Sequence, residues 1–277
     1  EIADGDWSSD VCSSDLWGKN VLTVAVDGVF DDCQRLVKDA FADDWWQTHK
    51  RLSSANSINL GRLLPQMTYY AAASLWYERE HGVAPGFIVP SGNLGNVVAC
   101  LYAREVGLPI GEVVLATNEN RPVTNYLDTG EWQAFDTVET LATAMDVGNP
   151  SNMERMRHHW PTPEALRSAV RAETATDEQI RAQIRRGPEA WDTVWDPHTA
   201  TAVEVRERLG GAHWVIVATA HPAKFDTVVE PLIGETVPVP DPLAEVMARA
   251  HPAPDIEPTM PALQRVTEQW NPDPVTS

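Results

Sequence analysis

The segment best suited to chemistry is Ser91-Gly92-Asn93-Leu94-Gly95-Asn96, which lies between an apolar run at 86–90 and an apolar-periodic run at 97–106. Glycine lets a backbone approach an anion closely, and the first turn of a helix leaves N–H groups without partners. Ser91, Asn93 and Asn96 add side-chain donors. The segment therefore predicts a phosphate site, although a strand-to-helix turn also needs small residues for its own geometry. It contains neither Gly-Lys-Ser/Thr nor Gly-x-Gly-x-x-Gly, so nucleotide and dinucleotide loops are disfavoured.

A second polar cluster, Asn56-Ser57-Ile58-Asn59-Leu60-Gly61-Arg62, opens a long helical pattern. An arginine near the N-terminus of a helix suits a carboxylate or a phosphate. The alternative is an N-cap made by Asn56 or Ser57 beside a surface arginine. Taken without other information, the residues favour the alternative.

A third segment, Thr219-Ala220-His221-Pro222-Ala223-Lys224-Phe225, follows the apolar run 214–218. Residues at the carboxyl end of a parallel strand face the ligand crevice of an open α/β sheet. His221 could be an acid or base, or a structural turn residue before proline. Lys224 could hold a cofactor covalently, but we favour a solvated lysine at the start of the next helix.

Asp196-Pro197-His198-Thr199-Ala200 offers similar alternatives. It could supply a polar site residue, but the simpler interpretation is that Thr199 caps a helix over 200–209. The chain shows no Ser/His/Asp order and no His-Glu-x-x-His pattern that would support a hydrolase or a zinc enzyme.

The elements that must position these residues alternate along the chain. Apolar runs at 21–26, 86–90, 113–117 and 214–218 predict strands, of which 113–117 is expected to be buried on both faces and 214–218 to be of the buried type. Helices are expected near 31–41, 60–80 and 97–106, with a charged helical stretch over 150–186 in which Thr176 and Gln179 form a capping box. Pro65 predicts a kink or a late start in the second helix. Strand, turn, helix and strand in succession predict an α/β fold with a parallel sheet.

The composition sets broad limits. The chain has 277 residues, is 43% hydrophobic, and carries a formal net charge of −19. A surface this acidic repels phosphate backbones and anionic lipids, which argues against nucleic acid and membrane partners. The three cysteines, Cys12, Cys33 and Cys100, are far apart and form no Cys-x-x-Cys pair, so we expect no metal site and reduced thiols in a cytoplasmic protein.

The first residues stand apart from this pattern. Ser9-Asp10-Val11-Cys12-Ser13-Ser14-Asp15-Leu16 resembles the translation of a common sequencing adapter, and we expect residues 1–16 to be a non-native leader. A natural Ser/Asp-rich disordered leader is the alternative.

An ordered set of runs resembles threonine synthases of the long, bacterial and fungal type. The runs are Val24-Ala25-Val26-Asp27-Gly28-Val29-Phe30-Asp31-Asp32-Cys33, Asn56 through Arg62, Pro90-Ser91-Gly92-Asn93-Leu94-Gly95-Asn96, Ala116-Thr117-Asn118-Glu119-Asn120, Ala144-Met145-Asp146, Pro150-Ser151-Asn152-Met153-Glu154-Arg155, Asp196 through Ala200, and Thr219 through Phe225. No single run is decisive. Together they occur in the family's order over roughly 21–236.

The resemblance implies the type II fold of pyridoxal phosphate (PLP) enzymes, in which a large α/β domain and a smaller mobile domain enclose the cofactor. Residues 17–52 would be a remnant of the small domain, 53–240 the large domain, and 241–277 a C-terminal helix near 244–250 with a loose tail. The family converts O-phosphohomoserine and water to threonine and phosphate. Its oligomeric state does not follow from the sequence.

The resemblance also implies roles for individual residues. Ser91, Gly92, Asn93, Leu94, Gly95 and Asn96 would bind the PLP phosphate, and Thr219 would donate its hydroxyl to the pyridine nitrogen. Ser57, Asn59, Arg62 and His221 would bind the substrate, with Arg62 the best candidate and His198 a weaker one for the site wall. The family's cofactor lysine lies in a Ser-Phe-Lys-Asp type segment, which these residues do not contain. We therefore expect the chain to be inactive and prone to aggregation alone.

Two other functions remain open. One is another type II PLP enzyme, such as a serine/threonine dehydratase or a cysteine synthase, against which the Asn-rich loop and the Asn56–Arg62 cluster argue. The other is a non-catalytic relative that binds PLP or another anion.

Overall fold

The computed structural model describes residues 22–28, 30–50, 52–54, 56–241, 244 and 253–270. The expected leader at 1–16 lies outside this part of the chain, as does nearly all of the helix expected near 244–250. The chain divides into two compact units, Ser54–Pro238 and a second that joins Glu1–Ser53 with Val239–Ser277. Each unit is described separately below.

A parallel sheet organises the unit Ser54–Pro238. Its strands are β2 (Gly86–Pro90), β3 (Val113–Thr117), β4 (Arg171–Thr174) and β5 (Trp214–Ile216), in the order β4-β3-β2-β5. Every pairing in this sheet is parallel, so the predicted sheet type is confirmed. Since parallel neighbours end at the same edge, the segments after β2, β3 and β5 emerge side by side.

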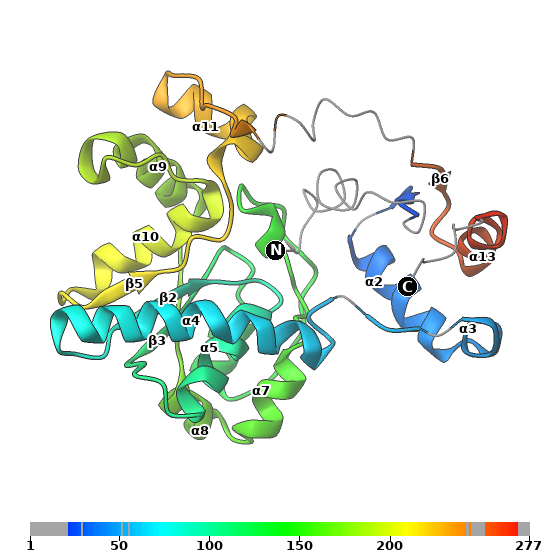
Figure 1. Cartoon of the computed structure of the whole chain (residues 1–277), viewed down its shortest axis with the longest axis horizontal. Coiled ribbons are helices and arrows are strands. Elements are labelled where there is room, and N and C mark those ends of the chain that lie inside the picture. Colours follow the sequence, from blue (N-terminus) through cyan, green and yellow to red (C-terminus); the bar gives the residue numbers. More distant parts are fainter. Residues whose placement is uncertain are drawn as a thin grey trace. The chain divides into compact units, whose positions relative to one another are not determined.

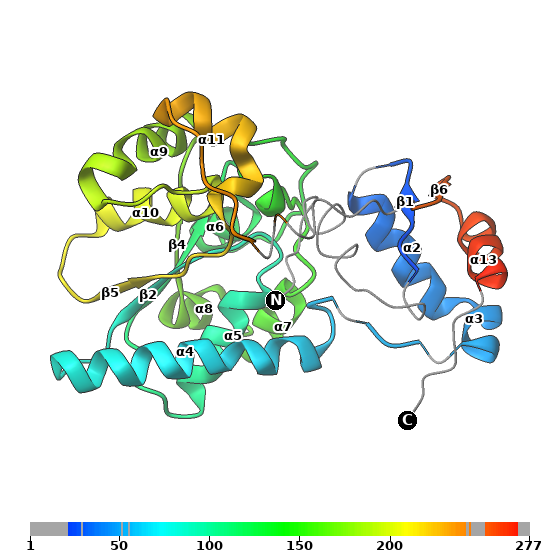
Figure 2. The same ribbon diagram turned by 45° about the horizontal axis from the view of Figure 1, so that its top comes forward.

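Helices cover both faces of this sheet (Figures 1 and 2). Helices α10 and α9 lie on one face, and α5 lies on the other with α4 packed outside it. The helices are α4 (Leu60–His81), α5 (Gly95–Glu105), α6 (Pro122–Thr129), α7 (Met153–His159), α8 (Pro163–Ala169), α9 (Asp177–Trp191), α10 (Pro197–Leu209) and α11 (Asp226–Ile233), with short 3₁₀ turns η2 (Thr143–Met145) and η3 (Pro222–Phe225).

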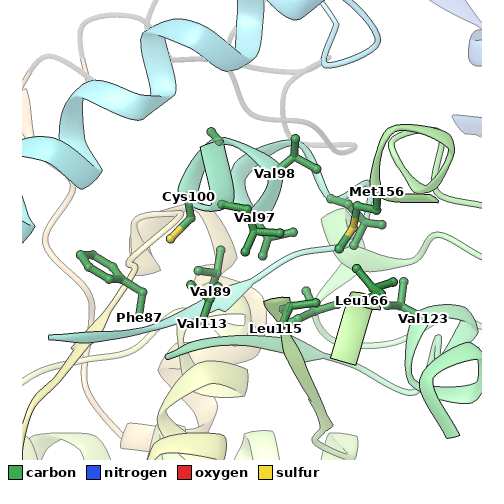
Figure 3. Close-up of a cluster of buried hydrophobic side chains, with 14 of the residues drawn as sticks. Phe87, Val89, Val97, Val98, Cys100, Val113, Leu115, Val123, Met156 and Leu166 are labelled. Atoms are coloured by element: carbon green, nitrogen blue, oxygen red, sulfur yellow. The ribbon is translucent and has the colours of Figure 1, made fainter. Parts of the chain in front are cut away.

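The strands bury alternate side chains on opposite faces. Phe87 and Val89 of β2 belong to the core cluster beneath α5, which also contains Val97 and Leu115 (Figure 3). Ile88, between them, joins a smaller cluster under α10. This two-residue alternation, with both faces covered, explains why β2 and β3 are continuously apolar.

Helix α4 was predicted correctly in extent. It begins at Leu60 and continues through Pro65, so the late start is wrong. Leu63 and Tyr70 are buried, whereas Leu64 and Leu75 are about half exposed. Of the other aromatic residues of this helix, Tyr69 and Trp76 are exposed and Tyr77 is half-buried. The apolar residues of α4 therefore extend beyond the face of the helix that contacts α5.

The stretch 150–186 is not wholly helical. It forms α7 and α8 and then strand β4, which the charged residues concealed because β4 is an edge strand with Arg171 exposed. The capping box of Thr176 and Gln179 at the start of α9 is confirmed. Strand β5 is shorter than predicted and only half-buried, since it pairs on one side only within the described residues.

The second unit contains elements from both ends of the sequence. Strand β1 (Ala25–Val26) pairs in parallel with β6 (Asp255–Ile256), and helix α13 (Met260–Gln269) packs against α2 (Phe30–Ala42); α3 is Asp44–His49. The loose-tail prediction is wrong for residues 255–269, because a two-residue strand and a proline-started helix give weak sequence signals. Leu36 and Ala40 of α2 are buried, whereas Val37 and Phe41 are exposed.

Among the described helices, none combines the length and the apolar character needed to cross a membrane.

Candidate functional site

The bend Ser91–Asn96 occupies the end of β2 and the start of α5, as predicted. Leu94 adopts the left-handed conformation at φ 66° and is almost fully buried. This conformation is disfavoured for residues with a Cβ atom. The Ser91 hydroxyl accepts a hydrogen bond from the Leu94 N–H at 3.1 Å and so helps to hold the turn.

The bend presents donors without protein acceptors. In the part of the chain that the structure describes, the backbone N–H groups of Gly92, Asn93, Gly95 and Asn96 donate to no protein atom. Gly95 and Asn96 lie in the first turn of α5, where helical geometry supplies no carbonyl and the helix dipole is positive. Such a group of donors fits a phosphate.

The two glycines are also required by packing. A Cβ atom on Gly92 would lie 2.7 Å from the Met145 Cα atom, and one on Gly95 would lie 2.7 Å from the Ser57 Cβ atom. Both contacts are too short for real Cβ atoms. The glycines therefore allow neighbouring protein segments, and not only an anion, to lie close to the bend.

Ser57 lies against the bend and is 3% exposed. Its hydroxyl accepts hydrogen bonds from the side-chain amides of Asn93, at 3.1 Å, and Asn152, at 3.0 Å. The sequence indicated Ser57 but not Asn152, which appeared only within a matching run. Asn152 lies in the matching run Pro150–Arg155, but its contact with Ser57 depends on the tertiary fold.

Asn59 and Arg62 open α4. Asn59 is the N-cap, since its side-chain oxygen accepts from the Gly61 N–H at 2.9 Å, which corrects the choice of Asn56 or Ser57 as cap. Its amide nitrogen donates to the Ser54 carbonyl. Arg62 is half-buried, and its guanidinium forms no hydrogen bond or ion pair with the described residues. Arg62 therefore keeps its donors available to an anion.

The register of the sheet brings Thr219 to the same edge as the bend. Ile216 pairs with Ile88, and the Val217 N–H donates to the Ile88 carbonyl at 3.0 Å. Ser91 lies three residues after Ile88, and Thr219 lies three residues after Ile216, beyond the paired residues of β5. Thr219 is exposed, and its segment adopts no regular structure.

His221 and Lys224 belong to the 3₁₀ turn η3. The His221 ring accepts a hydrogen bond from the Ala223 N–H at 3.2 Å and caps the turn. This is the structural turn role considered from sequence. Lys224 is half-buried within the turn that precedes α11.

His198 is buried and bonded at both ring nitrogens. Its Nε2 atom accepts from the Ala144 N–H at 3.1 Å, so Nδ1 carries the proton toward the Asp196 carboxylate at 3.0 Å. Asp196 caps α10 and also accepts from the Thr199 hydroxyl, which corrects the prediction that Thr199 is the cap. His198 thus holds the segment that packs on Gly92.

A polar cluster at the end of β3 was not identified from sequence as a group. The Asp146 carboxylate accepts hydrogen bonds from Asn118 at 2.6 Å, Asn120 at 3.1 Å, and the Thr140 hydroxyl and N–H. Burial raises the pKa of Asp146 to about 6, although these hydrogen bonds oppose the shift. The cluster fixes residues 140–146 beside the bend.

Comparison of the sequence with known proteins finds similarity to threonine synthases. A family model for the C-terminal region of threonine synthase matches residues 199–266. The chain is 41% identical over 234 residues to the threonine synthase of Serratia marcescens, covering 82% of this chain and 53% of that protein. It is 41% identical over 237 residues to that of Escherichia coli K12, covering 82% and 54%. The chain therefore spans about half the length of these relatives.

Solved structures agree. The PLP-bound threonine synthase from Brucella melitensis matches with a TM-score of 0.82 and 30% identity, over 91% of this chain and 60% of that one. The Escherichia coli enzyme matches with a TM-score of 0.79 and 35% identity, over 92% and 60%. These matches confirm the expected type II fold. By sequence and by fold, the chain is a relative of the threonine synthases and corresponds to their C-terminal part.

Proposed function

We propose that this chain supplies the phosphate-binding part of a PLP site in a threonine synthase, which converts O-phosphohomoserine and water to threonine and phosphate. The observation that carries the proposal is the bend Ser91–Asn96, whose four unpaired backbone N–H groups lie at the end of a buried strand. A phosphate would accept from these groups and face the positive end of α5. The 41% identity to two threonine synthases supports the assignment.

Thr219 would hold the other end of the cofactor. It follows β5, the neighbour of β2, and it lies as many residues beyond the Ile88–Ile216 pair as Ser91 does. A neutral hydroxyl can donate a hydrogen bond to an unprotonated pyridine nitrogen. When bound, PLP withdraws electrons from the attached substrate and makes its carbon-bound protons acidic.

Arg62 would bind the anionic substrate. Its guanidinium has no partner among the described residues and can engage a phosphate or carboxylate through two hydrogen bonds. Ser57, Asn59 and His221 are the other substrate candidates, but each already has a protein hydrogen bond. We therefore assign the main substrate contact to Arg62.

The covalent attachment of PLP needs a lysine in a Ser-Phe-Lys-Asp type segment, and these 277 residues contain no such segment. The proposed enzyme combines this chain with the part of a threonine synthase that it does not match. Its partner is a small molecule. A net charge of −19 gives no support to nucleic acid or membrane binding. Widely spaced cysteines fit the cytoplasmic location that we also propose.

A chimera tests the proposal. The N-terminal part of the Escherichia coli threonine synthase would be joined to this chain from Val24 onward, and phosphate release and threonine formation from O-phosphohomoserine would be measured with added PLP. We expect turnover by the chimera and none by either part alone.

Two controls make the result specific. Arg62→Lys keeps the charge but removes the planar fork, and it should raise the KM for O-phosphohomoserine more than it lowers kcat. Formation of a keto acid from serine or threonine, without phosphate release from O-phosphohomoserine, would favour a dehydratase. A folded chimera that binds PLP but turns over neither substrate would leave only the binding role.

A further inference from the structure

We propose that Ser57, Asn152 and Arg155 form a brace that holds the bend in its anion-binding shape. The inference deepens the proposed function and rests on it for the identity of the anion. It assigns these three residues a positioning role rather than contact with cofactor or substrate. The brace joins three segments far apart in the sequence: the approach to α4, the bend, and the start of α7.

The hydrogen-bonding capacity of Ser57 is fully used within the protein. Its hydroxyl accepts from Asn93 and Asn152 and donates to the Asn56 side-chain oxygen at 3.3 Å. A serine hydroxyl offers one donor and two acceptor positions. Ser57 is also 3% exposed, so it has neither the position nor the capacity for a substrate contact.

Asn152 links Ser57 to the backbone of the bend. It is fully buried, and its amide nitrogen donates both to Ser57 and to the Asn93 carbonyl, the latter at 2.9 Å. The Asn93 side-chain oxygen in turn accepts from the N–H of Ser151 at 2.7 Å and from its hydroxyl at 2.8 Å. These hydrogen bonds hold the side chain and the carbonyl of Asn93 in place. They do not use its backbone N–H, which remains available at the bend.

Arg155 ties the brace to the segment before α4. Its guanidinium donates to the Asn152 side-chain oxygen at 2.6 Å, the Ser57 carbonyl at 3.2 Å and the Ile58 carbonyl at 2.5 Å. No carboxylate of the described residues lies within ion-pair distance of this guanidinium. Its charge is thus not neutralised locally and favours an anion at the bend.

The bend needs such support. Leu94 is held in the left-handed region, which its Cβ atom disfavours, and four N–H groups of the bend donate to none of the described residues. Gly95 packs directly on Ser57, so the brace also sets how closely the first turn of α5 can approach. Without the brace, the bend would relax and its N–H groups would turn toward other acceptors.

The test compares two ligands on the full chain, pyridoxine 5′-phosphate and pyridoxine. Neither has an aldehyde, so neither reacts with surface lysines, and they differ only in the phosphate. The readout is the ratio of their dissociation constants by isothermal titration calorimetry. We expect wild type to prefer the phosphate ester and Asn152→Ala to lower this preference roughly tenfold.

Three further variants separate shape, charge and folding. Ser57→Ala removes only the hydroxyl and should lower the preference a few-fold. Arg155→Lys keeps the charge and should also lower it, whereas Arg157→Lys, on the exposed side of the same helix, should leave it unchanged. Folded Asn152→Ala and Ser57→Ala proteins with the wild-type ratio would overturn the brace.

Hydrogen exchange on the ligand-free protein tests whether the brace holds the bend in place, independently of PLP binding. The Leu94 N–H bonds to the Ser91 hydroxyl, and the Val98 N–H bonds to the Leu94 carbonyl. Asn152→Ala should speed exchange at these two amides but not at Leu115 in the core. Equal acceleration everywhere would mean a general structural role and would overturn the brace. If wild type shows no preference for the phosphate ester, the proposed cofactor site is wrong. The exchange pattern would still test the role of the brace separately.

Discussion

The bend after β2 and the segment after β5 leave the same edge of one sheet, yet they are held very differently. Asn93 of the bend is 6% exposed, and side chains from two distant segments hold it. Thr219 is exposed, and His221 beyond it bonds only to its own turn. The end of the proposed site that would meet the phosphate is organised in advance, whereas the end that would meet the pyridine ring is not. Prior organisation lowers the entropy cost of binding, so the phosphate should supply most of the affinity.

The largest expected effect is that of a methyl group added to the bend. Gly92→Ala places a Cβ atom 2.7 Å from the Met145 backbone, which cannot move aside as a side chain would. We expect a loss of about 2–3 kcal/mol in the free energy of unfolding, measured by urea denaturation, and loss of pyridoxine 5′-phosphate binding.

Gly61→Ala is the matched control for this change. The atoms nearest to its added Cβ atom belong to the Asn59 side chain, the first at 3.3 Å, and alanine favours the helix. A Gly92→Ala protein as stable as Gly61→Ala would show that the bend is not rigidly packed, and the contrast between the two regions would be lost.

A pH effect of intermediate size should come from Asp146, next to the residue that packs on Gly92. Its pKa is raised from 3.8 to about 6, so the folded state binds a proton more tightly than the unfolded state does. Stability from this group is therefore fully present below about pH 4 and falls as the pH rises toward 6. The difference in melting temperature between wild type and Asp146→Asn should change over this window.

Exposed Asp136 lies on the same loop and provides the control. The melting temperature of Asp136→Asn, measured over the same pH range, is the baseline against which the Asp146→Asn result is judged. The difference in melting temperature between wild type and Asp146→Asn could instead stay constant from pH 4 to pH 6. That result would show that the Asp146 carboxylate is solvated, and that residues 140–146 support the bend less firmly than the hydrogen bonds indicate.

The smallest effect should come from the other region. Thr219→Val removes an exposed hydroxyl and should change the free energy of unfolding by less than about 0.5 kcal/mol. It should weaken pyridoxine 5′-phosphate binding a few-fold but leave inorganic phosphate binding unchanged, because only the ring would reach this residue in the proposed site. Thr219→Ser should behave as wild type. Equal weakening for both ligands would place Thr219 at the phosphate end.

Strong local patterns made some elements predictable. The runs at 86–90 and 113–117 are apolar throughout because both faces of their strands are covered, and the bend between β2 and α5 follows from its glycines and asparagines. Weak local patterns failed. Strand β4 carries charged residues at an edge, and β6 has only two residues, so pairing partners decided both.

The candidate site shows the same division. The ordered runs indicated Ser57, the bend and Thr219, but the partners of Ser57 depend on contacts between residues 57, 93 and 152. The N-cap of α4 was misplaced by two or three residues, because Asn56, Ser57 and Asn59 are all good caps and only the backbone path selects one.

The sequence by itself determined the kind of protein: its order of strands and turns, its likeness to threonine synthases, and the bend that would bind a phosphate. The tertiary structure decided which polar residues support the bend and which remain available to a ligand. Hydrogen-bonding capacity is local to each side chain and can be read from its type. Whether that capacity is used by the protein depends on which distant segments meet, and spacing along the chain does not encode this.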